Sequence, residues 1–167
     1  MKTVTSSLKL TDDRFTTVEE DDDNYETPDK LYNDLCMKYG IKPKLDICAD
    51  EINRKCLDYI SKEQNALFTE WTLNNKIVDV WANPPGSIQL EFIARAESQY
   101  LKYNMNILMI LPTRVMGTPI WDKYIEDDYN RKREYHRITG RPTFLKHGRK
   151  TKWSAMHAYV CVIWRKK

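Results

Sequence analysis

The chain has 167 residues, of which 41% are hydrophobic and 31% are charged, a composition typical of a soluble globular protein. This length is sufficient for one domain with a full core, but not for two. No apolar run approaches the roughly 18 residues that a membrane helix requires, and the first residues lack the apolar core of a secretion signal. We therefore expect no membrane association and a cytoplasmic location.

The cysteine and histidine pattern gives no sign of a metal site. The four cysteines form no CxxC pair, and no histidine follows them at the spacing of zinc ligands. We expect reduced thiols and no bound metal. The cysteines are Cys36, Cys48, Cys56 and Cys161, and the histidines are His136, His147 and His157.

The charges are distributed unevenly although the net charge is only +3. Residues 1–24 contain three basic and seven acidic side chains, and we interpret them as a flexible acidic arm. Residues 25–167 form the predicted folded domain and contain 24 basic and 17 acidic side chains. A basic surface of this kind suits a polyanionic partner, and a merely solubilising surface is an equally good interpretation.

The predicted domain begins with a helix and a short strand. Thr27 suits the N-cap and Pro28 the first turn of a helix that ends at Gly40. Residues 44–49 predict a buried strand that ends in small residues, which let a ligand approach the backbone. A helix starting near Ile52 or Asn53 would direct its amide groups at such a ligand. Residues 57–60 predict a second short strand.

The motif Asn83-Pro84-Pro85-Gly86 follows an apolar strand over residues 77–82. Two prolines end the strand and stiffen the turn, at the sheet edge where open α/β folds bind ligands. The Asn83 amide oxygen and a proline carbonyl are two acceptors that could hold a planar exocyclic amine, such as N6 of adenine. From these four residues alone, an ordinary loop turn is the alternative.

The remaining elements complete an α/β pattern. Ser87 suits the cap of the next helix, and residues 105–111 predict a parallel strand that is buried on both faces. Alternating strands and helices favour a mostly parallel sheet, and the late strands favour an antiparallel hairpin at its edge. The later predicted elements are a helix near residues 121–125 and strands at 143–145 and 156–164.

Six sequence blocks then occur in a fixed order between Tyr25 and Trp164: YETP, LDICAD, NRKC, NALxxxW, VWANPP and GRPTFL. In these blocks the chain resembles the phage-type DNA N6-adenine methyltransferases, which use S-adenosylmethionine. The resemblance implies a Rossmann-like class I methyltransferase fold, with a seven-stranded, mostly parallel sheet ending in an antiparallel hairpin. It also implies a prokaryotic or phage-infected cell.

The resemblance assigns site residues block by block. A target adenine would be flipped out of double-stranded DNA, and its amine would be held in line with the methyl group that it receives. Carried over in this way, the target amine would be held by Asn83, Pro84, Pro85 and Gly86. The cofactor would be bound by Thr27 near its methionine part, by Asp46, Cys48 and Ala49 at the first strand, and by Asn65 and Ala66 near its adenine.

Gly86 departs from the family pattern, in which an aromatic residue at this position stacks on the flipped base. Stacking of this kind is worth about 1–3 kcal/mol. Three outcomes are open: another aromatic such as Trp121 or Trp153 stacks instead, the pocket accepts another substrate, or the protein has kept the fold and lost the activity.

Any preference for a DNA sequence is expected to come from loops, because the chain has no room for a separate recognition domain. The loops are residues 113–124 and 129–153. The alternatives to a DNA methyltransferase are a non-catalytic nucleic-acid-binding relative and a methyltransferase that acts on RNA or on protein amides. The basic residues expected to contact DNA are Arg114, Arg131, Arg133, Lys146, Arg149, Lys150 and Lys152.

Overall fold

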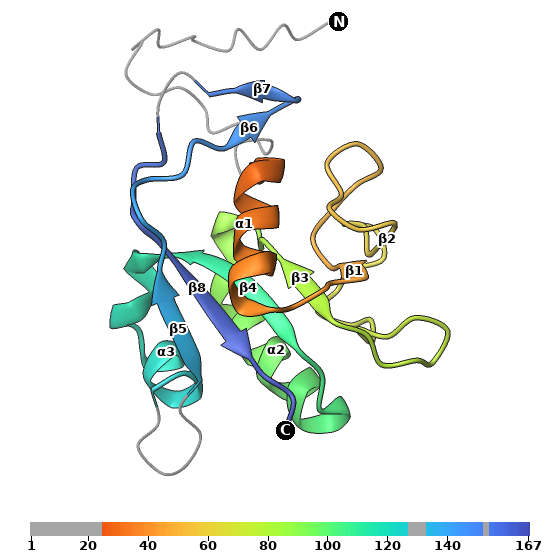
Figure 1. Ribbon diagram of the computed structural model, residues 1–167. Coiled ribbons are helices and arrows are strands. Elements are labelled where there is room, and N and C mark those ends of the chain that lie inside the picture. The colour runs from red at the N-terminus through yellow and green to blue at the C-terminus, as the bar shows by residue number, and fades with distance from the viewer. Residues whose placement is uncertain (1–24, 127–132, 152–153) are drawn as a thin grey trace, which may run out of the picture.

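The computed structural model describes residues 25–126, 133–151 and 154–167. Within them, six strands form one sheet in the order β2-β1-β3-β4-β8-β5, and a separate hairpin consists of β6 and β7 (Figure 1). The strands are β1 (Leu45–Asp46), β2 (Asp58–Tyr59), β3 (Val80–Ala82), β4 (Ile107–Pro112), β5 (Glu134–Arg137), β6 (Leu145–Lys146), β7 (Arg149–Lys150) and β8 (Tyr159–Trp164). The helices are α1 (Asp29–Tyr39), α2 (Gln89–Tyr103) and α3 (Pro119–Tyr124), with 3-10 turns η2 (Gly86–Ile88) and η3 (Thr113–Gly117).

The sheet is mixed and mostly parallel. Strands β2, β1, β3 and β4 pair in parallel, whereas β8 runs antiparallel to both β4 and β5. The predicted α/β class and the C-terminal antiparallel pair are thus confirmed. The resemblance implies seven strands, and the described part of the sheet contains six. Beyond β2 the chain forms turns, with Asn65, Asn74 and Asn75 at positive φ, and these turns add no further strand.

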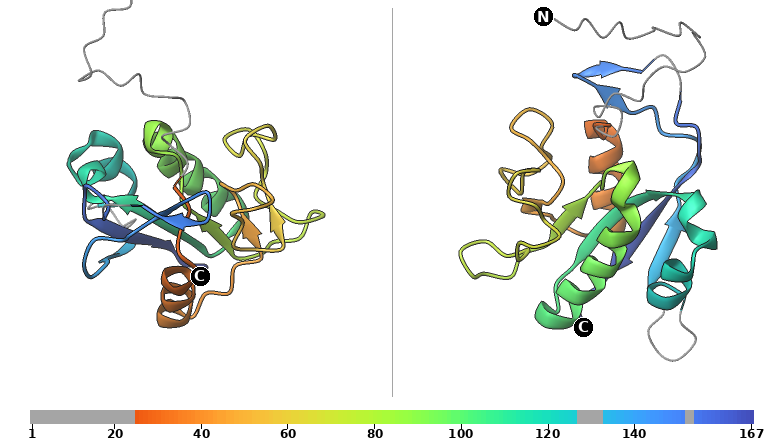
Figure 2. Two further views of the ribbon diagram at one scale, coloured as in Figure 1. Left: turned by 90° about the horizontal axis from the view of Figure 1, so that it is seen from above. Right: turned by 180° about the vertical axis from the view of Figure 1, so that it is seen from behind.

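Both faces of the sheet are covered, as the apolar sequence of β4 predicts. Helix α1 lies on one face, and α2 and α3 lie on the other (Figure 2). Ile107, Met109 and Leu111 of β4 belong to the core under α2 and α3, whereas Leu108 and Ile110 belong to the core under α1. Alternate side chains of one strand therefore serve two cores. Among the described residues, no helix is long and apolar enough to cross a bilayer.

Two predicted helix caps are wrong. Helix α1 begins at Asp29 with Pro28 at its N-cap, and Thr27 lies one residue outside it. The Thr27 hydroxyl instead accepts a hydrogen bond from the side chain of Asn83. Ser87 lies inside the 3-10 turn η2, and α2 follows with Ile88 at its N-cap and no side-chain cap. The chain thus passes from Pro85 into a tight turn before the α-helix begins.

The helix predicted near Ile52 is also absent. Residues 51–53 form turns in which the Asp50 carboxylate accepts hydrogen bonds from the N–H groups of Ile52 and Asn53, both at 2.8 Å. Such local bonds from an aspartate side chain offer the backbone an alternative to a helix. No helical dipole therefore points at a ligand from this segment.

Candidate active site at the carboxyl ends of the central strands

A cavity of about 410 Å³ lies beside the carboxyl ends of β3 and β4. Asn83, Pro84 and Gly86 line it directly after β3, and Pro112 and Arg114 line it at the end of β4. The volume is within the range of small-ligand sites, and the position is the one where open α/β sheets bind ligands. Three of the four residues of the predicted proline motif therefore reach one cavity.

Two long-range hydrogen bonds orient the Asn83 side chain. Its Nδ2 donates to the carbonyl oxygen of Tyr25 at 3.0 Å and to Oγ1 of Thr27 at 3.1 Å. A carbonyl oxygen can only accept, so the partner at Tyr25 identifies the nitrogen end of the amide. Both amide hydrogens are thereby used within the protein, and the Oδ1 atom is the end left to accept from a ligand.

The segment that orients Asn83 is itself held by the β6–β7 hairpin. Glu26 and Leu145 exchange two backbone hydrogen bonds of 2.8 and 2.9 Å. The N–H of Gly148 also faces the Glu26 carboxylate at 3.3 Å. Figure 1 shows this hairpin beside the beginning of α1. Residues separated by more than 100 positions thus fix one wall of the cavity.

Arg114 connects the two strand ends that border the cavity. Its Nη2 donates to the carbonyl oxygen of Gly86 at 3.0 Å and to Oε1 of Gln89 at 3.1 Å. Gln89 is buried, whereas Arg114 is exposed. The guanidinium therefore fixes the loop after β3 and remains accessible at the cavity.

The aromatic residues at the cavity differ from those predicted to replace an aromatic at position 86. Trp121 is fully buried in the core under α2 and α3, in edge contact with Tyr135 at a centroid distance of 5.2 Å, so it cannot stack on a base. Trp153 lies outside the described residues. The cavity is lined instead by Phe144, Tyr159 and Tyr25, which is 44% exposed.

The end of β1 adjoins the end of β3. The two strands pair in parallel, and the N–H of Ile47 donates to the carbonyl oxygen of Trp81 at 3.1 Å. Burial raises the pKa of the Cys48 thiol, and a hydrogen bond from the backbone N–H of Asn83 acts in the opposite direction. A residue predicted to bind cofactor therefore contacts the residue predicted to hold the amine.

Asp46 organises the loop that follows β1. Its side chain is buried, and its two oxygens accept hydrogen bonds from the N–H groups of Cys48 at 3.1 Å and Lys55 at 3.0 Å. Burial raises the pKa of this carboxyl to about 6, and the two backbone hydrogen bonds oppose the rise. The carboxylate of Asp46 therefore holds the loop that follows β1.

The other predicted cofactor residues lie on the β1 and β2 side of the sheet. Ala49 is buried after β1. Asn65 adopts a φ of 52° in the turn after β2, where its side chain accepts from the N–H of Leu67. Ala66 is buried, and its carbonyl accepts from Trp71 Nε1 at 2.8 Å. None of the six predicted cofactor residues lines the 410 Å³ cavity.

Six of the seven residues predicted to contact DNA fall into three groups. Arg114 lines the cavity, and Lys146, Arg149 and Lys150 lie in the β6–β7 hairpin, where the last two are exposed. Arg131 and Lys152 lie outside the described residues.

Arg133 is the exception, because it is an internal structural residue. Its guanidinium forms two hydrogen bonds with the buried Glu97 and lies over the Tyr100 ring, 4.4 Å from the centroid. Only 10% of its side chain is exposed. The structure therefore gives Arg133 a partner inside the fold, since a basic residue in a basic segment can also neutralise an internal carboxylate.

Sequence reasoning missed Tyr25, Phe144 and Tyr159 as cavity residues. Each comes from a different part of the chain, and the bridge between Glu26 and Leu145 brings two of these parts together. The sequence feature that could have indicated these residues is that Tyr25 lies in the YETP block and Phe144 in the GRPTFL block, both among the six ordered blocks. In the described ranges, no cluster of three histidine, cysteine or carboxylate side chains could hold a metal ion.

Comparison with known proteins identifies the family of the chain. The family model described as DNA N-6-adenine-methyltransferase (Dam) matches residues 14–167. A protein of Haemophilus phage HP1 (strain HP1c1), named DNA N-6-adenine-methyltransferase, is 35% identical over 105 residues, which are 63% of this chain and 57% of the phage protein. The match thus spans little more than half of that relative. Because the family model covers nearly the whole sequence, the chain belongs to the DNA N-6-adenine-methyltransferase (Dam) family.

Proposed function

We propose that this protein transfers a methyl group from S-adenosylmethionine to the N6 amine of adenine in DNA, within a class I methyltransferase fold. The orientation of Asn83 carries the proposal. Its amide hydrogens are used by Tyr25 and Thr27, so Oδ1 is the end available to accept a hydrogen bond from an amine in the cavity. An acceptor fixed before the substrate arrives requires no reorganisation during the reaction.

The chemistry assigned to the chain is mainly positioning. S-adenosylmethionine supplies an activated methyl group, so no nucleophilic side chain is needed. Oδ1 of Asn83 and the Pro84 carbonyl would accept from the two N6 hydrogens, which turns the nitrogen lone pair toward the methyl donor. The same acceptors would stabilise the positive charge that develops on nitrogen as the nitrogen–methyl bond forms and the methyl–sulfur bond breaks. S-adenosylhomocysteine would be the leaving group, and one N6 proton would then pass to solvent.

The proposed cofactor residues suit such a donor in their placement and size. Cys48 and Ala49 follow β1, and Cys48 contacts the backbone of Asn83. The small buried side chains of Ala49 and Ala66 leave room for close approach to the backbone, and the exposed amide of Asn65 offers a polar group. Asp46 would act indirectly, by holding the loop from Cys48 to Lys55.

The target base would be flipped out of the duplex, because a stacked base cannot reach a cavity of this kind. Tyr25 is the exposed aromatic of the cavity and lies on the same segment that orients Asn83. We assign to it the stacking function that Gly86 cannot provide. Arg114, Lys146, Arg149 and Lys150 would contact the phosphate backbone around this site.

The direct test is methyl transfer from isotopically labelled S-adenosylmethionine to mixed-sequence DNA, with RNA and a protein extract as parallel substrates. We expect N6-methyladenine in DNA, identified by mass spectrometry of the nucleosides. Asn83→Ala should lower kcat about 100- to 1000-fold, the usual effect of removing one group that stabilises a transition-state charge. Cofactor binding, measured by calorimetry, should remain close to that of the wild type.

Three results would contradict the proposal in whole or in part. Salt-sensitive DNA binding without methyl transfer, and without stabilisation by the cofactor, would identify a non-catalytic relative. Transfer to RNA or protein in preference to DNA would change the substrate class. Equal transfer by the wild type and Asn83→Ala would remove Asn83 from the mechanism.

A further inference from the structure

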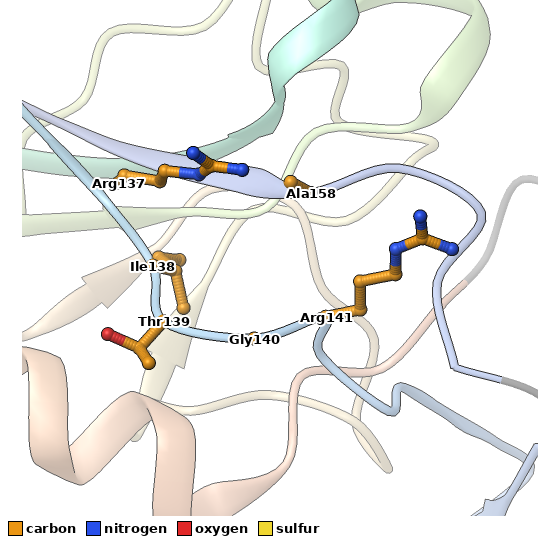
Figure 3. Close-up of a pocket in the computed structure, with 6 residues that line it drawn as sticks. All are labelled: Arg137, Ile138, Thr139, Gly140, Arg141 and Ala158. Atoms are coloured by element: carbon orange, nitrogen blue, oxygen red, sulfur yellow. The ribbon is translucent and has the colours of Figure 1, made fainter.

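A second cavity, of about 500 Å³, lies beyond the end of β5 and carries two arginines at its lining (Figure 3). Arg137 is the last residue of β5, and Arg141 follows the turn at Gly140. Ala158 lines the same cavity from the residue before β8. In the part of the chain that the structure describes, no carboxylate lines this cavity, and the charged groups that line it are both positive.

The two guanidinium groups are available for a ligand. Arg137 and Arg141 are exposed, and Figure 3 shows their guanidinium groups on either side of Ala158. Within the described ranges, neither arginine has a carboxylate partner, whereas Arg133 and Arg165 are paired with Glu97 and Glu134. An arginine that forms an ion pair inside the fold stabilises the fold. Two arginines without carboxylate partners, both at one cavity, suit a planar or tetrahedral anion.

The backbone between the arginines contributes to the same site. Gly140 has a φ of 75°, a conformation that glycine adopts without strain, and it turns the chain so that both arginines line one cavity. Among the described residues, no backbone carbonyl accepts from the N–H groups of Thr139, Gly140 or Arg141. Backbone N–H groups without partners, next to two guanidinium groups, are typical components of a phosphate site.

The second cavity and the candidate active site are lined by adjacent residues of the chain. Ala158 lies between His157 and Tyr159, both of which line the 410 Å³ cavity. Arg141 is three residues from Phe144, which also lines that cavity. A nucleotide that enters the active site would therefore have its backbone close to the arginines.

We infer that the cavity at Arg137 and Arg141 binds a backbone phosphate of the DNA strand that carries the target base. The inference rests on the proposed function, since it assigns a phosphate contact to the same substrate. It adds a site beyond the basic residues expected from the sequence. The ligand is one phosphodiester group, held by two guanidinium groups and recognised without regard to base sequence.

The salt dependence of DNA binding tests this assignment. Fluorescence anisotropy of a labelled duplex between 50 and 250 mM NaCl gives the slope of log K against log salt concentration, which changes by about 0.9 per phosphate contact. The double variant Arg137→Ala/Arg141→Ala should bind more weakly and lower the magnitude of the slope by about 1 for one shared phosphate, whereas Arg137→Lys/Arg141→Lys should keep most of the slope.

A matched control removes the same charge elsewhere. Lys42 and Lys44 are exposed and precede β1, so they lie at the opposite edge of the sheet from the strand ends that form both cavities. Lys42→Ala/Lys44→Ala should leave the slope within error of the wild type. A slope lowered equally by both double variants would show a general charge effect and overturn the site, as would a slope that neither variant changes. Thermal unfolding of each variant confirms that the fold is intact.

DNA with uncharged backbone linkages distinguishes a DNA phosphate from free phosphate as the ligand. Single methylphosphonates are placed in turn around an adenine that the wild-type enzyme methylates, and affinity is measured for the wild type and the arginine double variant. We expect one position at which the modification weakens the wild type and has no further effect on the variant. Additive effects at every position would overturn the assignment to DNA. Stabilisation by millimolar inorganic phosphate, at constant ionic strength and only in the wild type, would then identify free phosphate as the ligand.

Failure of this inference can be distinguished from failure of the proposed function. If the wild type methylates adenine while the arginine variants bind DNA as it does, the enzyme assignment stands and the phosphate site falls. If the wild type neither binds nor methylates DNA, the proposed function itself fails. Cofactor binding is a third measurement, and the arginine substitutions should not change it.

Discussion

Asp46 ends β1 and Asn83 follows β3, which pair in parallel, and both residues belong to blocks of the same resemblance. The structure nevertheless uses them differently. Asn83 takes its partners from residues 56 and 58 positions earlier in the chain, and both bonds use its amide nitrogen. Asp46 takes its partners from residues 2 and 9 positions later, and both of its oxygens are used. Asp46 holds its own loop, whereas we propose that the remaining acceptor of Asn83 serves a ligand.

The difference shows that the position of the hydrogen-bond partners in the chain distinguishes a side chain that holds a loop from one that can bind a ligand. A side chain whose hydrogen bonds come from its own loop stabilises that loop. A side chain whose donor end is fixed by a distant segment has its remaining acceptor oriented by the whole fold. The first arrangement should appear mainly in stability measurements, and the second mainly in catalysis.

The largest effect that we expect from the difference between Asp46 and Asn83 is a pH dependence of the unfolding free energy, caused by Asp46. Burial raises the pKa of its carboxyl from 3.8 to about 6. Between these values the folded protein retains a proton that the unfolded chain releases. The stabilising contribution is therefore complete below pH 4 and is lost as the pH rises through 6, which amounts to about 3 kcal/mol.

Urea unfolding of the wild type and Asp46→Asn from pH 4 to 7 measures this effect. The asparagine cannot ionise, so the difference in unfolding free energy between the two proteins isolates the carboxyl. We expect the wild type to lose stability relative to the variant as the pH rises. A constant difference, or a relative gain by the wild type, would mean that the carboxylate is not penalised by burial.

A second prediction separates the two contributions of Tyr25. Its backbone carbonyl orients Asn83, and its exposed ring lines the cavity. Tyr25→Ala keeps the carbonyl and removes the ring, so it should weaken productive DNA binding by about 1–3 kcal/mol, or ten- to hundredfold in KM for DNA. Tyr25→Phe should retain most of the affinity, and cofactor binding should be unchanged in both variants. An unchanged KM in Tyr25→Ala would assign stacking to another residue.

Much of the fold follows from local sequence patterns. The apolar run that becomes β4, the proline turn after β3 and the short helix containing Trp121 were all predictable, because periodicity and proline act over a few residues. The missing helix near Ile52 and the displaced cap at Thr27 have the opposite cause. In both cases a polar side chain forms a hydrogen bond that the spacing of apolar residues does not predict.

The candidate site was less predictable because its walls come from distant segments. The motif at Asn83 could be located from the sequence, but its orientation depends on Tyr25 and Thr27, and theirs depends on the hairpin that contacts Glu26. Arg133 shows that the position of a charged side chain is equally hard to predict from the sequence. Its sequence context is basic, and only the fold reveals that Glu97 lies opposite its guanidinium.

The smallest expected effect tests whether the long-range bonds to Asn83 matter for catalysis. Thr27 is buried, and its Oγ1 accepts one of the two Nδ2 hydrogen bonds at 3.1 Å. Thr27→Val keeps the shape of the side chain and removes this acceptor, while the bond to the Tyr25 carbonyl remains. One hydrogen bond is worth about 1 kcal/mol, so kcat should fall about fivefold. Thr27→Ser restores the hydroxyl and should restore kcat. If Thr27→Val lowers the melting temperature but leaves kcat at the wild-type value, the hydroxyl stabilises the fold, and the Tyr25 carbonyl alone is sufficient to orient the amide.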